Sequence, residues 1–150
     1  MGVISRMMNR IRTGVFLFTL LISLPLLSAE EDLIKVDSTS SAADTIDTLK
    51  LLIEQAGYEI YSVFDHGDKK NMKQVISFGN TSMHGQIMWH DSAASLELPF
   101  KIAVHEDEMG DVTVIYRKPT ALRKTYNLEA CGLLDKMDRV LAELAEYAAE

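Results

Sequence analysis

Residues 98–117 read LPFKIAVHEDEMGDVTVIYR, and this stretch decides the fold because apolar and polar residues alternate in it twice. A period of two residues is typical of a strand with one packed face and one exposed face. The acidic run at 106–110 separates the two halves and ends in Gly110, which is typical of a turn. This run lacks the alternating oxygen ligands of a calcium-binding loop. We therefore predict an antiparallel β-hairpin with a solvated acidic tip.

Two stretches on either side of the hairpin have helical periodicity. Between residues 43 and 56 the apolar side chains recur at helical spacing, and Gly57 follows where a helix often ends in a left-handed residue. Ser41, three residues before Asp44, is typical of a capping box at the start of this helix. Near the C-terminus a second helix is predicted, and its apolar face comprises Leu134, Met137, Leu141, Leu144 and Ala148, joined by Leu133 and Val140.

Three further segments predict strands. Residues 58–64 alternate in polarity, residues 75–78 form a short β-type run, and residues 33–36 add one more short segment. The chain shows no internal repeat, and its length of 150 residues suits a single domain. The order of elements predicts an α+β fold in which two main helices pack on an antiparallel sheet, a β-α-β(4)-α layout.

The N-terminal residues 1–29 are typical of a signal peptide. Basic residues and no acid precede an apolar stretch at 15–27, and two small residues then lead to Glu30. The alternative is an uncleaved anchor, but Pro25 disfavours a helix long enough to span a membrane. We predict cleavage and a periplasmic or secreted protein, with an N-terminal strand and polar linker at 30–41 followed by a domain at 42–150.

The charge of the mature chain limits its partners. Without the three leader arginines, 12 basic and 22 acidic residues remain, a net charge of −10. Such a surface repels phosphate, which excludes nucleic acid as a partner and disfavours docking on anionic lipid. After signal cleavage we expect no stable membrane insertion. The single cysteine, Cys131, excludes an intrachain disulfide framework and a cysteine-only metal cage.

Several short motifs carry a family resemblance. They are Asp65-His66 after a strand, Phe78-Gly79-Asn80, Leu98-Pro99-Phe100-Lys101, and Gly110 before 112–116 and Pro119. In this order and spacing the chain resembles the domain of unknown function 302 family over about residues 42–150. The resemblance implies a small α+β domain, often a homodimer, without an agreed activity. Two departures are visible: Thr81 stands where the family usually has proline, and the segment between 66 and 78 is too short for a helix expected there.

One group of residues forms a candidate ligand-binding surface. His66 follows a predicted strand and is suited to bind a ligand or to transfer protons, because imidazole changes charge near neutral pH. The alternative is that residues 65–68 simply form a turn. Gly79-Asn80 predicts a turn that requires a positive φ. With the family resemblance, these features place a candidate site near Asp65, His66, Asn80 and Met88.

Cys131 offers a second candidate for chemistry. If it begins the last helix, the helix dipole would activate its thiol. The chain has no Cys-x-x-Cys motif and no Gly-x-Ser-x-Gly elbow that would support a redox centre or a catalytic triad. The alternatives are an ordinary half-buried thiol and an intersubunit disulfide.

Residues 83–90 read MHGQIMWH and form the most distinctive local cluster. On a strand, His84, Met88 and His90 would share one face, and on a helix His84 and Met88 would still be neighbours. Imidazole and thioether together suit cuprous copper, so His84, Met88 and His90 are the predicted metal ligands. The alternative is a strand in which Met88 fills a gap in the core. On a regular strand the Trp89 side chain would lie on the opposite face, and we assign it to packing.

These observations together predict a non-catalytic module that binds a small ligand or a partner. The alternatives are a periplasmic copper-binding protein and a redox or hydrolytic enzyme that uses His66 or Cys131. Copper is the one candidate cofactor. We expect a homodimer, both from the family resemblance and because an exposed sheet edge would otherwise need covering.

Overall fold

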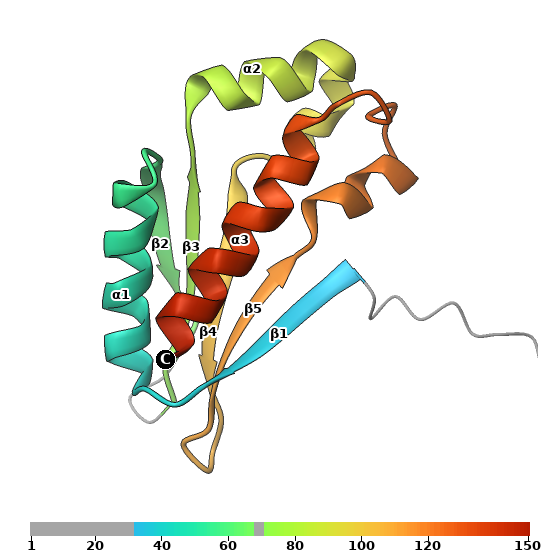
Figure 1. The fold of residues 1–150 in the computed structure, drawn as a ribbon. Helices are drawn as coiled ribbons and strands as arrows, with labels where there is room; N and C mark the ends of the chain where they lie inside the picture. Colours follow the sequence, from blue (N-terminus) through green and yellow to red (C-terminus); the bar gives the residue numbers. More distant parts are fainter. Residues whose placement is uncertain (1–31, 68–70) are drawn as a thin grey trace, which may run out of the picture.

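The fold is taken from a computed structural model that describes residues 32–67 and 71–150. Within these residues, helical segments separate one single strand from two pairs of consecutive strands (Figure 1). In chain order the elements are β1 (Leu33–Ser38), α1 (Ala42–Gln55), β2 (Glu59–Asp65), β3 (Lys73–Gly79), α2 (Thr81–His90), the 3-10 helix η2 (Ser92–Glu97), β4 (Phe100–Glu106), β5 (Val112–Arg117), the 3-10 helix η3 (Pro119–Lys124) and α3 (Leu133–Ala149). The predicted signal peptide, residues 1–29, lies outside the described residues.

The strands form one antiparallel sheet in the order β1-β5-β4-β3-β2. The predicted hairpin stands at its centre, with Ile102 of β4 opposite Tyr116 of β5. β1 pairs with β5 along its whole length, so the strand at the predicted N-terminal segment is an edge of the same sheet. The predicted α+β fold with helices packed on an antiparallel sheet is confirmed.

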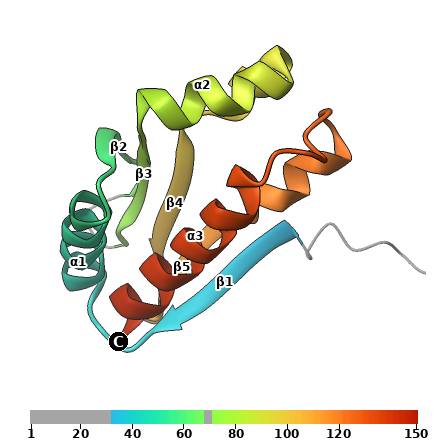
Figure 2. The same cartoon turned by 45° about the horizontal axis from the view of Figure 1, so that its top comes forward.

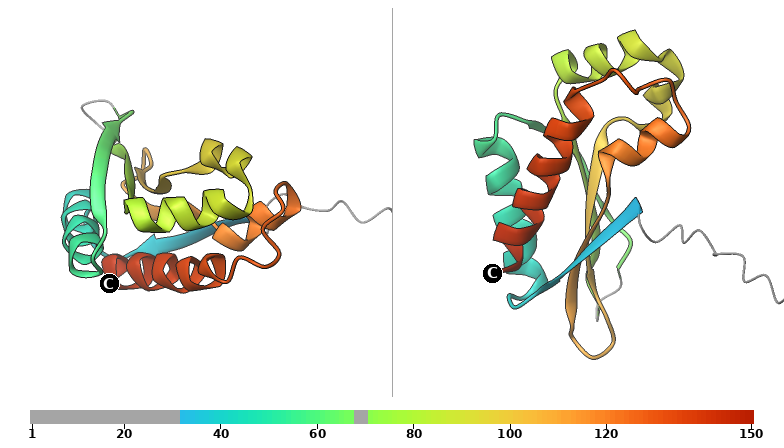
Figure 3. Two further views of the ribbon diagram at one scale, coloured as in Figure 1. Left: turned by 90° about the horizontal axis from the view of Figure 1, so that it is seen from above. Right: turned by 45° about the vertical axis from the view of Figure 1, so that its right-hand side comes forward.

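One face of the sheet is covered by α1 and α3, which lie side by side on it (Figures 2 and 3). The apolar helix faces are buried as predicted, including Leu49 and Ile53 of α1 and Leu134, Met137 and Leu141 of α3, all fully buried. Their counterparts on the sheet, among them Ile76, Ile102 and Val114, are equally buried. Each such side chain contributes about 1.5–3 kcal/mol when it leaves water. This inner face therefore holds the core, and the outer face of the sheet carries no α-helix in the described part.

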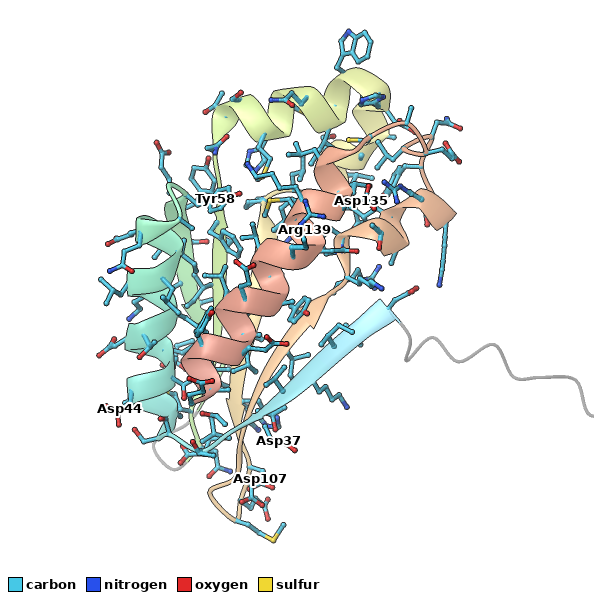
Figure 4. The ribbon with its side chains drawn as sticks, in the orientation of Figure 1. Asp37, Asp44, Tyr58, Asp107, Asp135 and Arg139 are labelled. Carbon is cyan, nitrogen blue, oxygen red and sulfur yellow. The ribbon has the colours of Figure 1, made fainter. Side chains whose placement is uncertain are left out.

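The caps predicted for α1 are confirmed. The Ser41 hydroxyl accepts a hydrogen bond from the backbone N–H of Asp44 at 3.2 Å and donates one to the Asp44 carboxylate at 2.6 Å. After the helix, Gly57 has a φ of +80°, the left-handed conformation that glycine adopts without strain. At the hairpin tip, Gly110 has a φ of +89°. Figure 4 shows Asp107 at this tip, where its carboxylate accepts the backbone N–H groups of the turn.

The segment after β3 is a helix, which decides between the two conformations that the sequence left open. α2 lies across the end of the sheet at which β3 finishes (Figure 3). We call this the α2 end, and we call the end with the β4–β5 tip the hairpin end. No described helix is long and apolar enough to cross a membrane.

Candidate functional site

The outer face of the sheet carries a row of polar and cationic side chains at the α2 end. Ser77 of β3 pairs with Lys101 of β4, and Leu33 of β1 pairs with Arg117 of β5. Lys101 and Arg117 each lie one residue beyond the Ile102–Tyr116 pair, so they stand directly opposite each other on neighbouring strands. Like charges opposite each other destabilise a sheet unless something compensates them. Two hollows open on this row.

The first hollow, which we call the sheet-end pocket, has a volume of about 250 Å³. Its apolar lining includes Phe100 and Leu122, which are 6% and 4% exposed, and the half-buried Ala103 and Ile115. Its charged lining comprises Lys101, Arg117, Lys118 and Glu97. An apolar floor with three cations and one carboxylate around it suits an apolar molecule that carries a negative charge.

The charges around this pocket are not paired with one another. Within residues 32–67 and 71–150, the ion pairs are Lys50–Asp47, Arg123–Asp135 and Lys124–Asp32. The one carboxylate of the pocket, Glu97, accepts a hydrogen bond from the Tyr126 hydroxyl at 2.9 Å, and this bond raises the pKa of Tyr126. The Lys101 ammonium donates to the carbonyl of Pro99 at 3.1 Å, which leaves its other N–H groups for a ligand.

The second hollow, which we call the aromatic groove, is shallower and measures about 530 Å³. Tyr61 and Phe64 of β2 line it and are 44% and 54% exposed. The hydroxyls of Ser62 and Ser77 are hydrogen-bonded to each other on its floor. Lys101 lines both hollows, so the same ammonium group can contact a ligand in either of them.

His84 of α2 also lines the aromatic groove, and its imidazole is constrained. The buried Nε2 has no hydrogen-bond partner among the described residues, and the Tyr61 ring lies 5.7 Å from the imidazole ring. Burial lowers the pKa of His84, because the charged form would lose hydration. The neutral imidazole faces Gly79. No hydrogen bond joins it to a groove hydroxyl in the described part, so the pairing of a nucleophile with its base is absent there.

The residues predicted to form one ligand site lie at two ends of the sheet. His66 follows β2, and its backbone N–H donates to the Lys73 carbonyl at the start of β3. Asn80 and Met88 lie beyond the end of β3, about 20 Å away along a seven-residue strand. One small ligand cannot contact both pairs, so the predicted surface around Asp65, His66, Asn80 and Met88 is wrong as a single site.

At the hairpin end, Asp65 and His66 have structural roles in a turn and a ring stack. The Asp65 carboxylate accepts the backbone N–H of Gly67 at 2.8 Å, which is the turn that the sequence offered as the alternative. The exposed His66 ring stacks on Phe64 with 6.4 Å between ring centres. His66 therefore flanks the aromatic groove without lining it.

The prediction of a positive φ at Gly79-Asn80 is wrong. Asn80 has a φ of −151° and is the N-cap of α2, where its side-chain oxygen accepts the backbone N–H of Met83 at 2.8 Å. Gly79 is needed for space instead, because a Cβ there would approach Met83 Cε to 2.9 Å and overlap the His84 ring. The dipeptide is thus a strand-to-helix junction.

The three predicted metal ligands do not share a face. On a helix, His84 and Met88 are about 40° apart, whereas His90 is turned by roughly 240° from His84 and lies about 9 Å further along the axis. The strand in which all three converge is therefore wrong, and the pair His84–Met88 remains. The alternative in which Trp89 packs inward is also wrong, since that side chain is 83% exposed. No group of three His, Cys, Asp or Glu side chains in the described residues is placed to hold a metal ion.

Cys131 precedes α3 and is 2% exposed, more deeply buried than the predicted half-buried thiol. Its backbone carbonyl accepts a hydrogen bond from Arg123 at 3.0 Å. It lines neither hollow. Burial removes the access that an intersubunit disulfide requires.

The sequence analysis missed Lys101 and Arg117 as site residues. Alternation placed both on the polar side of their strands, but it gave no reason to connect residues sixteen positions apart. The signal that could have identified them is their equal distance from the hairpin turn. In an antiparallel hairpin, residues equally far from the turn are neighbours across the two strands.

Comparisons with known proteins agree with the fold. A family profile described as "Domain of unknown function DUF302" matches residues 34–144. A crystal structure of an uncharacterized conserved protein of that description from Bacillus stearothermophilus superposes with a TM-score of 0.68. It is 18% identical, and the alignment covers 79% of this chain and 98% of the other. A search of curated proteins finds no match.

Proposed function

Because this chain belongs to the DUF302 family, whose description states no activity, we propose its function from the site alone: a non-catalytic module that binds a small organic anion on the outer face of the sheet. The observation that carries the proposal is the pair of cations, Lys101 and Arg117, that stand opposite each other without a carboxylate partner in the described part. An anion between them would relieve their repulsion and gain charge-assisted hydrogen bonds.

The surroundings of the two cations support binding rather than catalysis. Apolar and aromatic side chains line both hollows, and such linings with a few polar groups are typical of ligand pockets. The alternative hypothesis, a redox or hydrolytic enzyme, requires His66 or Cys131 to lie in a pocket beside another polar group. Neither residue lines the sheet-end pocket or the aromatic groove.

The experiment compares 2-naphthoate with uncharged 2-naphthalenemethanol by isothermal titration calorimetry. The acid should bind at least tenfold more tightly than the alcohol, since only the acid pairs with the two cations. Lys101→Gln and Arg117→Gln should each weaken the acid about tenfold, the effect of one charge-assisted hydrogen bond. Lys136→Gln, an exposed lysine of α3, is the matched control and should change nothing. Equal binding of acid and alcohol, or equal affinity in all variants, would contradict the proposal.

We also propose that the protein is exported and acts as a homodimer. Export rests on the basic, apolar and small-residue order of 1–29. The dimer is supported by β2, an edge strand on which Val63 and Phe64 are 40% and 54% exposed. Exposed apolar edges are normally covered, and a second copy would cover this one.

A further inference from the structure

A β-bulge in β2 shapes the aromatic groove. The pairing of β2 with β3 shifts by one residue between Ile60 and Ser62, which makes Tyr61 an extra residue in the ladder. Ile60 packs against the core, so strict alternation after it would also turn Phe64 toward the inner face. The extra residue reverses the alternation, and Phe64 lines the groove together with Tyr61. Bulges of this kind re-aim side chains and are frequent beside functional sites.

The rings of Tyr61 and Phe64 remain available to a ligand. They are 44% and 54% exposed, although both line the same hollow. The His66 ring stacks on Phe64 with 6.4 Å between ring centres, which supports the Phe64 ring from outside the groove. Two partly exposed aromatic rings in one groove suit a ligand that itself carries an aromatic ring, because such rings attract each other beyond the area that they bury.

The groove combines one positive charge with a floor whose hydroxyls are already bonded. Among the described residues that line it, Lys101 is the one charged side chain, because burial lowers the pKa of His84 and keeps its imidazole neutral at pH 7. The Ser62 and Ser77 hydroxyls are hydrogen-bonded to each other, so an apolar ring can cover them without leaving either unpaired. The groove therefore suits an apolar ring with one negative charge.

We propose that the organic anion is an aromatic carboxylic acid, whose ring lies in the aromatic groove against Tyr61 and Phe64 while its carboxylate binds Lys101. The inference rests on the proposed function, because Lys101 belongs to the same cation pair, and it adds the chemical class of the ligand. A carboxylate at Lys101 stays beside Arg117, since the two cations stand opposite each other on neighbouring strands. A saturated ring would gain only the burial of apolar area, whereas an aromatic ring also gains the contact with the two groove rings.

The experiment compares 2-naphthoate with its saturated counterpart, decahydro-2-naphthoate, by isothermal titration calorimetry. Both acids have the same charge and carbon skeleton, and 2-naphthoate should bind about fivefold more tightly or better. Tyr61→Leu and Phe64→Leu should each reduce this ratio of affinities about threefold, because each removes one aromatic contact. Tyr147→Leu removes a ring that is 61% exposed on α3, and as the matched control it should leave the ratio unchanged.

The ratio of two affinities in one protein is insensitive to a general loss of binding, and two groove variants cover the case in which one fails to fold. The inference is overturned if the wild type binds both acids equally tightly, or if a folded groove variant keeps the wild-type ratio. If both acids then still lose affinity in Lys101→Gln and Arg117→Gln, the anion site stands and the aromatic selection alone is wrong. If neither acid binds, the proposed function is wrong as well.

Discussion

At the scale of single residues, His84 has the one buried side-chain polar atom that lacks a hydrogen-bond partner in the described part of the chain. Its Nε2 is buried without a partner, and its ring occupies the space that a side chain at position 79 would need. Gly79 and His84 are therefore coupled: the glycine allows the imidazole to lie against β3, and the imidazole in turn forms part of the wall of the aromatic groove. Two predictions test this coupling.

Gly79→Ala should lower the free energy of unfolding by about 1–3 kcal/mol, because a Cβ there overlaps the His84 ring and Met83 Cε, and an overfilled site must shift. Gly85→Ala is the matched control in the same segment. Position 85 lies within α2 with no atom near a new Cβ, so alanine should stabilise by about 0.5–1 kcal/mol. Urea denaturation measures both, and equal effects in the two variants would refute the close packing at Gly79.

The lowered pKa of His84 gives a stability effect of known sign. An unfolded histidine titrates near pH 6.5, whereas the folded one takes up its proton only at lower pH. The unfolded chain therefore binds more protons below about pH 6.5, and the free energy of unfolding should fall from there as the pH decreases.

His84→Gln, which cannot titrate, should reduce the loss of stability between pH 7 and pH 5. His66→Gln, at an exposed position, should retain it. The carboxyl groups of Asp91, Asp107 and Asp135 also have lowered pKa values, but they destabilise only near and below pH 4. Urea titrations at several pH values separate the two windows, and an unchanged slope in His84→Gln would contradict the assignment.

At the scale of elements, α2 is the part whose conformation the pattern did not decide. Only Met83 and Ile87 of its ten residues are buried, so its apolar stripe is too narrow to distinguish it from a strand. The decisive local signal was Asn80 as an N-cap. Thr81 then occupies the first helical position, and that is where proline is favoured in helices. The departure from the family at this position is thus compatible with the same helix.

Removing the cap should therefore weaken α2. Asn80→Ala loses the hydrogen bond to the backbone N–H of Met83 and should cost about 1 kcal/mol of unfolding free energy. Asn80→Asp keeps an acceptor and adds negative charge at the helix N-terminus, so it should be at least as stable as the wild type. Thermal and urea denaturation compare the two. A stable alanine variant would mean that packing alone holds the helix.

At the scale of the whole molecule, the local charge on the outer face differs from the average charge of the chain. Figure 4 shows Asp37, Asp44 and Asp107 gathered at the hairpin end, whereas Lys101 and Arg117 lie at the α2 end of the outer face. The full chain has a net charge of −7, and this average does not reflect the local pair of cations. An anionic ligand can therefore bind a protein that repels anions on average.

The exported form should begin at Glu30. Expression of the full chain in a bacterium with a periplasm, followed by N-terminal sequencing of the soluble periplasmic fraction, should find this residue first, because the signal pattern ends at Ala29. Replacing the three leader arginines by glutamate should keep the protein in the cytoplasm. Recovery of intact Met1 in the membrane fraction would show that the leader is retained as an anchor.

The homodimer should depend on the β2 edge. Val63→Lys places a charge on this edge and should shift a dimer at high micromolar concentration toward monomer, as measured by light scattering. Leu51→Lys is the control, because Leu51 is 54% exposed on α1. The dimer should persist in reductant, since Cys131 is buried. Only monomer for the wild type would refute the dimer, and equal loss in both variants would refute the β2 edge as its interface.

The amino-acid order by itself determined the strands of the central hairpin, the two covering helices and the caps of α1. These features depend on spacing within a few residues, where a period of two or of 3.6 and a single cap side chain decide the outcome. Tertiary structure alone decided that residues 81–90 form a helix, that Asp65 and Asn80 lie at opposite ends of the sheet, and that Glu97, Lys101 and Arg117 surround one pocket. Those outcomes depend on strand order and register, because pairing across the sheet joins residues that no local period connects.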